Sequence, residues 1–270
     1  MPKGISLHIG LNSVSAAHYS GWSGELNACE ADANDLCEIA RSFEYKTKKL
    51  LTKDATRTAV RKAFTQAAAT LDRGDIFFLT YSGHGGQLPD RNGDEPDGID
   101  ETWCLYDGQL VDDEIFKLLG EFKKGVRIYA LSDSCHSGTV LKDAKAVDGR
   151  TEGKRYRAMP VEIAMRTYRD NQSTYDKVLT DKSLAQAEGK VVATALLMSG
   201  CQDNQLSSDG PFNGLFTSTL LRVWNNRAFA GSYVDFYRSI VRKMPADQTP
   251  NLFRVGQIDR AFESSRPFEI

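Results

Sequence analysis

The feature that most restricts the fold is a short, almost continuously apolar run at residues 75–81, with the sequence DIFFLTY. A run of this length without alternation between apolar and polar residues is typical of a strand buried on both faces. Residues 126–131 and 191–198 have the same character. We therefore expect a central sheet whose strands lie between two covering layers.

Segments with helical spacing alternate with these runs. Apolar residues recur on one face of residues 26–43 and again on one face of residues 56–71. Further strands are predicted at residues 5–11, 47–51 and 249–255, and further helices at residues 114–122, 214–224 and 233–241. The alternation of strand and helix predicts an α/β fold with a mostly parallel sheet.

Two polar stretches interrupt this alternation. Residues 83–107 are rich in glycine and acidic residues, and we interpret them as a long loop, which at this length is usually functional. Residues 139–189 are strongly charged, with one helix expected near residues 161–168. We expect one domain over residues 1–270, divided into a larger block at 1–140, a charged linker at 141–189 and a smaller block at 190–270.

Composition limits the class of protein. The formal net charge of −2 does not favour binding to nucleic acid or to an anionic membrane surface. No apolar run is long enough to cross a bilayer, and the N-terminal residues lead into a strand-like segment without the pattern of a signal peptide. The odd number of cysteines, without regular spacing, suits a reducing compartment, so we expect a cytoplasmic protein.

Reactive side chains follow two of the apolar runs. His84 stands in the sequence SGHGG after the first run, and Cys135 stands in SDSCHSG after the second. Because ligands of open α/β sheets bind at the carboxyl ends of the strands, we expect both side chains in one site. The Cys135 thiolate could attack a carbonyl while His84 moves the proton. The backbone N–H groups of Gly85 and Cys135 could then stabilise the oxyanion.

A zinc site is the alternative chemistry for the same residues. It would use His84, Cys135, His136 and a further cysteine. The adjacent pair Cys135-His136 suits no common zinc spacing, and the chain contains no Cys-x-x-Cys motif. We therefore favour nucleophilic catalysis over metal binding.

The two motifs resemble the histidine and cysteine motifs of metacaspases and of their bacterial relatives, the orthocaspases. Four further stretches resemble motifs of that family in the same order, with Ala28 where relatives often have glycine. They are LNACEADA at residues 26–33, DEPDGIDE at 94–101, SGCQDNQ at 199–205 and QTP at 248–250. A legumain-like or separase-like peptidase fits the second half of the chain less well.

The resemblance implies a fold and an activity. The expected fold is a caspase-like three-layer α/β/α sandwich, with a central and mostly parallel sheet of about six strands. The expected activity is that of a cysteine-type endopeptidase that works through a thioacyl intermediate and needs no cofactor for its chemistry. Metacaspases are generally monomeric, so a monomer is expected. A catalytically silent caspase-like module for binding or regulation is the alternative.

The resemblance also assigns a pocket for the substrate residue before the scissile bond. It implies that Cys29, Asp32, Ser82 and Asp203 surround this pocket, with Asp133 nearby. Several carboxylates in a partly desolvated pocket are stable only if a cation neutralises them. Protein or peptide substrates with Arg or Lys before the scissile bond would supply that cation, whereas Asp would be repelled.

The basic residues of the linker are candidates for self-processing. Relatives are often cut in this region, and an enzyme that cleaves after Arg or Lys could cut its own linker. A solvated charged loop is the alternative interpretation. The candidate residues are Lys142, Lys145, Arg150, Lys154, Arg155 and Arg157.

Calcium is a further expectation from the resemblance, because many metacaspases need it as an activator. The matching motifs imply Asp100, Asp112 and Asp113 as ligands, with Asp97 less clearly assigned. Clustered carboxylates suit calcium, which takes six to eight oxygen ligands. Asp112 could equally cap the next helix, with Asp113 favouring the positive end of that helix.

Overall fold

The main sheet joins strands from both ends of the chain. The structure, a computed structural model, describes residues 1–93, 95, 97–135, 150–151, 154–202 and 205–270. In this part of the chain six strands pair in the order β11-β10-β7-β3-β1-β2, all parallel except β11. They are β1 (Gly4–Gly10), β2 (Lys46–Leu51), β3 (Ile76–Ser82), β7 (Arg127–Asp133), β10 (Thr194–Ser199) and β11 (Asn251–Gly256).

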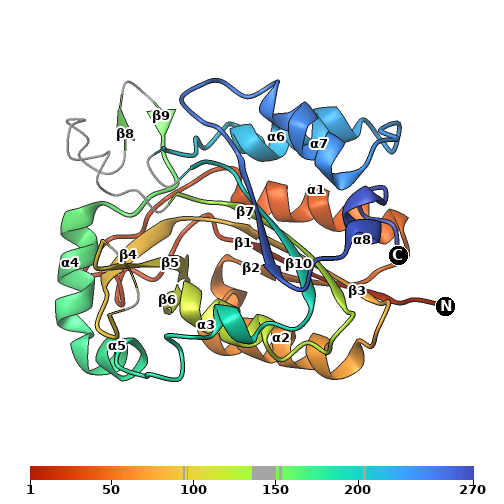
Figure 1. The fold of residues 1–270 in the computed structure, drawn as a ribbon. Coiled ribbons are helices and arrows are strands. Elements are labelled where there is room, and N and C mark those ends of the chain that lie inside the picture. The colour runs from red at the N-terminus through yellow and green to blue at the C-terminus, as the bar shows by residue number, and fades with distance from the viewer. Residues whose placement is uncertain (94, 96, 136–149, 152–153, 203–204) are drawn as a thin grey trace.

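Helices cover both faces of this sheet (Figure 1). One face carries α1 (Cys29–Ser42), α6 (Leu215–Trp224), α7 (Tyr233–Val241) and α8 (Arg260–Ser264). The other carries α2 (Arg57–Thr70) and α3 (Asp112–Leu119). The three-layer α/β/α sandwich with a mostly parallel sheet is therefore confirmed.

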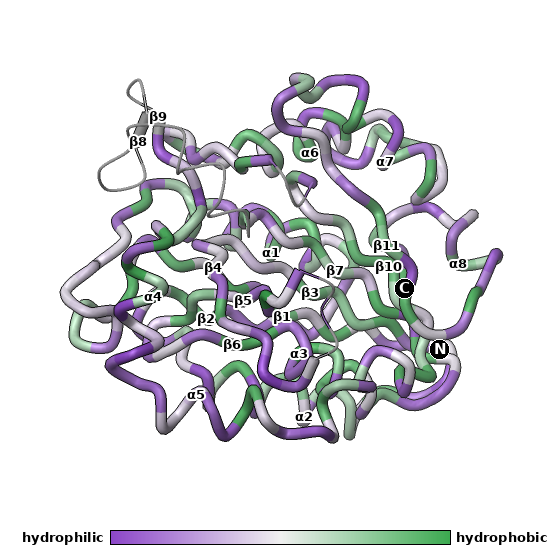
Figure 2. The backbone as a smooth tube through the Cα atoms, turned by 60° about the vertical axis from the view of Figure 1, so that its left-hand side comes forward, coloured by the Kyte–Doolittle hydropathy of each residue, from purple (hydrophilic) through white to green (hydrophobic). Residues whose placement is uncertain are grey.

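Adjacent aromatic residues on β3 explain why both faces need a cover. Phe77 packs against Phe64 of α2 and against Phe122, with ring centroids 5.6 and 4.9 Å away. Phe78 points to the opposite face, where it stacks on Tyr129 at 5.7 Å. Figure 2 shows hydrophobic residues gathered along these central strands. Full burial of one such side chain stabilises the fold by about 1.5–3 kcal/mol.

The expectation of a long loop at residues 83–107 is wrong. This region contains β4 (Gly85–Pro89) and β5 (Ile99–Leu105), which with β6 (Gly108–Val111) form an antiparallel three-stranded sheet. β4 begins with two glycines and β5 contains the polar run Asp100–Thr102, so neither has the apolar signature of β3. Trp103 of β5 stacks on Tyr81 of β3, with ring centroids 4.4 Å apart, which fastens the small sheet to the large one.

The linker region is more structured than its charge suggests. The helix expected near residues 161–168 is confirmed as α4 (Val161–Asp170), and α5 (Gln172–Leu179) follows it. Two-residue strands β8 (Arg150–Thr151) and β9 (Lys154–Arg155) pair before α4. Short 3-10 turns, η1 (Thr52–Asp54) and η4 (Glu188–Lys190), complete the elements that the structure describes. Among the described residues, no helix combines the length and apolar character that a membrane span requires.

The parallel arrangement collects four strand ends at one edge. Gly10, Ser82 and Asp133 are register partners at the ends of β1, β3 and β7. Ser199 ends β10 beside Ser132. Because these carboxyl ends meet, the residues that follow them share one crevice.

Candidate active site

His84 lies just beyond β3 and is held on several sides. The Tyr81 hydroxyl donates to the His84 carbonyl at 2.7 Å, and the His84 ring nitrogen Nε2 contacts the Gly24 carbonyl at 2.9 Å. The Trp22 ring lies against the imidazole, 4.7 Å between centroids. Burial lowers the pKa of His84 to about 4, against the opposing effect of the Gly24 carbonyl. The imidazole is therefore neutral near pH 7 and able to accept a proton.

Cys135 lies just beyond β7 and is fully buried. Its Sγ contacts the backbone N–H of Ser207 and lies 3.6 Å from the Sγ of Cys201. Among the described residues, no hydrogen bond joins the Cys135 thiol to the His84 ring. A segment of the chain itself crosses the site beside these two residues.

That segment runs from Arg155 to Met159 and forms isolated bridges at Tyr156 and Ala158. On one side the Asp209 N–H donates to the Arg155 carbonyl at 2.9 Å, and the Arg157 N–H donates to the Ser207 carbonyl at 3.0 Å. On the other side the Met159 N–H donates to the Gly85 carbonyl at 2.8 Å. We refer to residues 155–159 as the resident segment. It is paired along both edges, as an extended peptide is when it adds to a sheet.

The carbonyl oxygen of Arg157 accepts two backbone hydrogen bonds. The Gly85 N–H donates to it at 2.9 Å and the Cys135 N–H at 3.1 Å. These two amides are the ones that the sequence singles out for an oxyanion site, and both distances suit that role. On the far side of the same peptide bond, the Ala158 carbonyl raises the pKa of His84, so His84 lies near Ala158.

The side chain of Arg157 fills a pocket lined by carboxylates. Its guanidinium is completely buried and forms ion pairs with Asp32 at 2.7 Å, Asp133 at 2.9 Å and Asp209 at 3.1 Å. The Ser82 hydroxyl accepts from the guanidinium at 2.8 Å and donates to Asp32 at 2.7 Å. Burial opposes the charge, but the carboxylates together raise the pKa of Arg157 well above its usual value.

The carboxylates are themselves held in place. Asp133 accepts from the Ser207 hydroxyl at 2.6 Å and from the Thr217 hydroxyl at 2.8 Å. Asp32 accepts from the Asn213 side chain at 3.0 Å and from the Gly214 N–H at 3.1 Å. Burial raises the pKa of Asp32, and the nearby Arg157 guanidinium works against that shift. The pocket is therefore assembled before any substrate enters it.

Three of the five residues expected around the pocket meet the guanidinium, namely Asp32, Ser82 and Asp133. Cys29 is buried nearby, and burial raises the pKa of its thiol. Asp203 lies outside the described residues. The third carboxylate is instead Asp209, which sequence reasoning missed. Its signal is weak, a polar SSDG stretch at residues 207–210 ahead of α6.

Gln248, which begins the last family motif, supports the wall of this pocket. It is buried, and its side-chain oxygen accepts from the Ser208 N–H at 3.0 Å. Its side-chain nitrogen donates to the Ser207 hydroxyl at 2.9 Å and to the Gly200 carbonyl at 3.2 Å. Gln248 thus holds Ser207 and Ser208, which pair with the resident segment.

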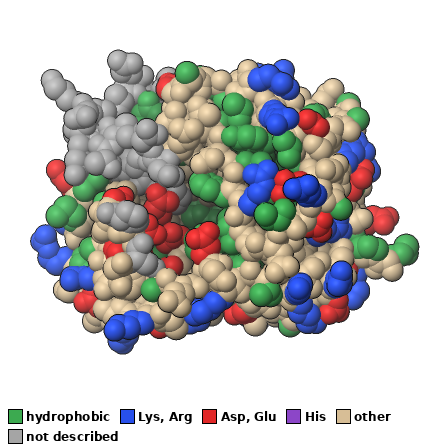
Figure 3. Space-filling model, in the orientation of Figure 1, with side chains coloured by type: hydrophobic (Ala, Val, Ile, Leu, Met, Phe, Trp, Pro, Cys, Tyr) green, Lys and Arg blue, Asp and Glu red, His purple; other side chains and the backbone are tan. Residues whose placement is uncertain are grey.

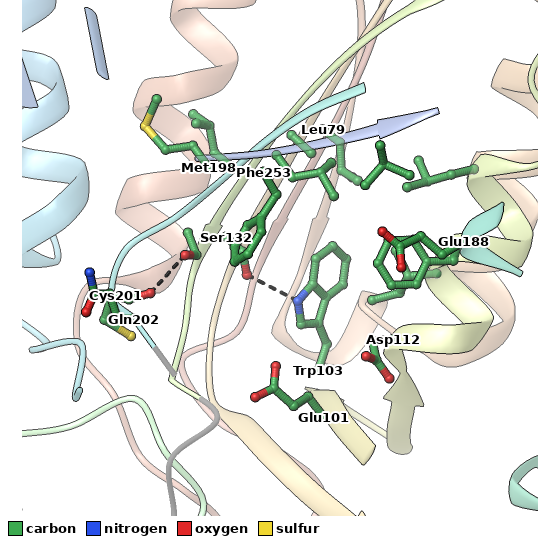
Figure 4. A pocket seen from close by; sticks show the side chains of 18 of the residues that line it. Leu79, Glu101, Trp103, Asp112, Ser132, Glu188, Met198, Cys201, Gln202 and Phe253 are labelled. Carbon is green, nitrogen blue, oxygen red and sulfur yellow. Dashed lines mark hydrogen bonds between the residues drawn. The ribbon is translucent and has the colours of Figure 1, made fainter. Parts of the chain in front are cut away.

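A separate cavity of about 580 Å³ opens beside α3 and β5. Hydrophobic side chains line its floor and acidic side chains stand at its edge (Figure 3). Cys201 and Gln202 lie at one end, and Trp103, Glu101 and Asp112 at the other (Figure 4). Neither Asp32 nor Asp209 lines it, because Arg157 already fills the pocket that those residues form.

The residues expected to bind calcium lie near this cavity. Asp100 is on β5, and Asp112 and Asp113 are the first residues of α3, with Val111 rather than Asp112 in the N-cap position. Burial raises the pKa of Asp112 well above its usual value, and Glu101, Asp113 and Asp100 raise it further. Within the described ranges, however, no group of three or more His, Cys, Asp or Glu side chains is arranged to hold a metal ion. His136 of the zinc alternative lies outside those ranges.

The candidate processing residues lie in different surroundings. Lys142 and Lys145 are outside the described residues, and Arg150 and Lys154 are on β8 and β9. The Arg155 side chain is partly exposed and donates to the Asn27 side chain at 3.0 Å. Arg157 differs from these residues because its side chain is buried among carboxylates.

The chain is similar to curated metacaspases. Metacaspase-1 of Mycosarcoma maydis is 30% identical over 264 residues, which cover 83% of this chain and 63% of that protein. Metacaspase-1 of Pyricularia oryzae is 37% identical over 154 residues, which cover 52% of this chain and 37% of that protein. The chain thus spans less than two thirds of the length of these curated relatives.

A solved structure and a family model are similar to all or most of the chain. The crystal structure of protein GSU0716 from Geobacter sulfurreducens is 56% identical, with a TM-score of 0.91, and covers 100% of this chain and 99% of that chain. The family model described as the caspase domain matches residues 14–262. The expected family is therefore confirmed, and the chain belongs to the caspase-domain family.

Proposed function

We propose that this chain is a cysteine endopeptidase that cleaves peptide bonds after Arg or Lys through Cys135 and His84. One observation carries the proposal. The Arg157 guanidinium is paired with Asp32, Asp133 and Asp209 while its carbonyl oxygen accepts from the amides of Gly85 and Cys135. The same residue thus occupies an acidic pocket and an oxyanion site, as the residue before a scissile bond must.

The chemistry follows from these positions. The Cys135 thiol gives its proton to His84, and the Cys135 sulfur attacks the carbonyl carbon held by the two amides. The negative charge that develops on the carbonyl oxygen is stabilised by the Gly85 and Cys135 N–H groups. His84 then donates the proton to the leaving amine, and water hydrolyses the thioester.

The shape of the pocket favours Arg over Lys. Asp133 contacts one terminal nitrogen of the guanidinium, and Asp32 and Asp209 contact the other. The planar guanidinium offers donors in several fixed directions, whereas a Lys ammonium is a single point charge. A substrate Asp would add a fourth negative charge to the pocket and is expected to be rejected.

Fluorogenic peptides ending in Arg, Lys or Asp test the proposal, with wild type and Cys135→Ala measured with and without calcium. Hydrolysis after Arg and Lys that is lost in Cys135→Ala supports both the nucleophile and the acidic pocket. Hydrolysis after Asp, or hydrolysis that persists in Cys135→Ala, contradicts it. No hydrolysis in any condition would favour the catalytically silent module.

Activation by calcium and a monomeric state are further parts of the proposal. The carboxylates Asp100, Asp112 and Asp113 have the chemistry that calcium prefers. Because the described carboxylates do not converge into a metal site, no step of the mechanism is assigned to calcium. We keep calcium as a proposed activator, and a monomer as the proposed working form. Protein or peptide substrates are the proposed partners.

A further inference from the structure

We propose that the enzyme cuts its own chain between Arg157 and Ala158, and that the resident segment inhibits the pocket until this bond is cut. The inference rests on the proposed function, and it selects one bond from a linker with six basic candidates. Three independent features of the site single out this bond: the pairing of the backbone, the burial of the side chain and the position of the carbonyl.

The pairing of the backbone sets the direction and register of the segment. Tyr156 forms an antiparallel bridge with Ser208, whereas Ala158 forms a parallel bridge with Gly85. The change of partner falls at Arg157, which is therefore flanked by pairing on both sides. A peptide paired before and after one bond presents that bond to the catalytic groups in a fixed orientation.

The side chain of Arg157 distinguishes it from its neighbour Arg155. Arg157 is completely buried, and its guanidinium contacts all three carboxylates of the pocket. Arg155 reaches away to the Asn27 side chain and the Glu25 carbonyl. Its own carbonyl accepts from the Asp209 N–H rather than from the oxyanion amides. Arg155 is thus close to the site but two residues out of register for cleavage.

The leaving group is also accounted for. Sulfur attack on the Arg157 carbonyl breaks the bond to the Ala158 nitrogen, which takes the proton carried by His84 and leaves as an amine. His84 lies on the Ala158 side of the bond, near the Ala158 carbonyl, which raises the pKa of His84. Water then cleaves the thioester, which releases the Arg157 carboxylate and returns a proton to the Cys135 sulfur.

Cutting this bond allows Arg157 to leave the pocket, while the two fragments of the chain stay together. Residues 158–270 contain β10 and β11, and β10 pairs with β7 inside the main sheet. The segment before the cut, in contrast, is no longer tethered on both sides. A tethered ligand has a high effective concentration, which falls once one tether is removed. Arg157 then competes less well with a peptide substrate.

Denaturing intact-mass measurement and N-terminal sequencing test the inference on the full chain, with and without calcium. Wild type is expected to give residues 1–157 and 158–270, the second beginning Ala-Met-Pro-Val-Glu. Cys135→Ala is expected to stay a single chain, even when mixed with wild type, because the resident segment lies in its own site. Arg155→Gln, a matched change two residues away, is expected still to be cut after Arg157.

Peptide hydrolysis measured on the same samples separates failure of this inference from failure of the proposed function. Activity toward Arg peptides is expected to rise in parallel with the cut fraction. Wild type that hydrolyses Arg peptides fully while residues 157 and 158 stay joined would overturn the inference and leave the proposed function intact. A cut at another bond would do the same. A chain that cuts neither peptides nor itself overturns both. Because the cut is located in wild type, these outcomes do not depend on whether a variant of Arg157 folds.

Discussion

The pocket around Arg157 and the acidic edge of the cavity beside α3 both bring several carboxylates together. In the first, a buried guanidinium pairs with Asp32, Asp133 and Asp209. In the second, Asp112 lies beside Glu101, Asp113 and Asp100, which raise its pKa. Of the ion pairs formed by the described residues, none involves Asp112.

The two acidic clusters differ in how their negative charge is compensated. Carboxylates that are dry and close together need a cation, because neither burial nor mutual repulsion favours their charged form. The pocket obtains its cation from the chain itself. At the cavity, burial and neighbouring carboxylates raise the pKa of Asp112, and this unfavourable charge is the physical reason to look for an external cation beside it.

Removing the Arg157 guanidinium is expected to have the largest effect on stability. In a Cys135→Ala background, Arg157→Met leaves three buried carboxylates without a cation, which should reduce the free energy of unfolding by about 3–5 kcal/mol. The loss should shrink as the pH falls, because the carboxylates then become protonated. Urea denaturation at several pH values measures it. Arg155→Met is the control and is expected to change stability little; an equal loss in both variants would contradict the ion-pair explanation.

Neutralising one wall of the pocket is expected to reduce cleavage after Arg. Asp32→Asn removes a carboxylate that contacts the guanidinium at 2.7 Å. We expect kcat/KM for Arg peptides to fall about 100-fold, or ~2.7 kcal/mol. Asp35→Asn is the matched control, since Asp35 lies on the same helix and also accepts from Asn213, but is not among the carboxylates that pair with Arg157. Unchanged kinetics in Asp32→Asn would show that Asp32 does not bind the substrate.

The choice between Arg and Lys tests the arrangement of the carboxylates rather than their charge. Because the three ion pairs are spread over two terminal nitrogens, a Lys ammonium cannot make all of them. We expect kcat/KM for Arg peptides to exceed that for otherwise identical Lys peptides about 10-fold, or ~1.4 kcal/mol. Equal values would mean that the pocket recognises charge alone.

The smallest expected effect concerns the cavity. The positive end of α3 favours Asp112, but burial and neighbouring carboxylates outweigh it and raise its pKa. A raised carboxyl pKa destabilises the folded state above that pKa, so Asp112→Asn should stabilise the protein at pH 7 by about 1 kcal/mol. The gain should fade as the pH falls through the raised pKa.

Thermal melts at pH 7 and pH 5 measure this effect, and calcium sharpens the comparison. If Asp112 helps to bind calcium, the ion should raise the melting temperature of wild type more than that of Asp112→Asn. Equal calcium effects on both proteins would remove Asp112 from any calcium site. A lower melting temperature for Asp112→Asn without calcium would contradict the repulsion inferred from its pKa.

Some elements of the fold could be predicted because the local sequence carries their signal. The apolar run at residues 75–81 predicted β3 nearly to the residue, since a strand buried on both faces admits few polar side chains. The strands at residues 83–107 could not be predicted in that way. Their pairing depends on packing against β3, seen in Trp103 on Tyr81, and packing between distant residues leaves no local pattern.

The residues of the site also divide into those with a local sequence signal and those without one. His84, Cys135 and the amide of Gly85 could be proposed from the sequence because they follow buried strands in distinctive motifs. Asp209 was missed because nothing in its own surroundings distinguishes it from a solvated loop residue. The sequence offered six basic linker residues as processing candidates, and the tertiary structure brings one of them, Arg157, among three carboxylates.

By itself the sequence determined the layered α/β fold, the family and the edge of the sheet at which the reactive groups collect. These depend on the periodicity of apolar residues and on residues near in the chain. Three-dimensional packing brings Asp32, Asp133 and Asp209 into one pocket and places a guanidinium from the linker in it. The stability of a buried ion pair depends on desolvation and on the distance between residues remote in sequence. Neither quantity can be read from the local order of amino acids.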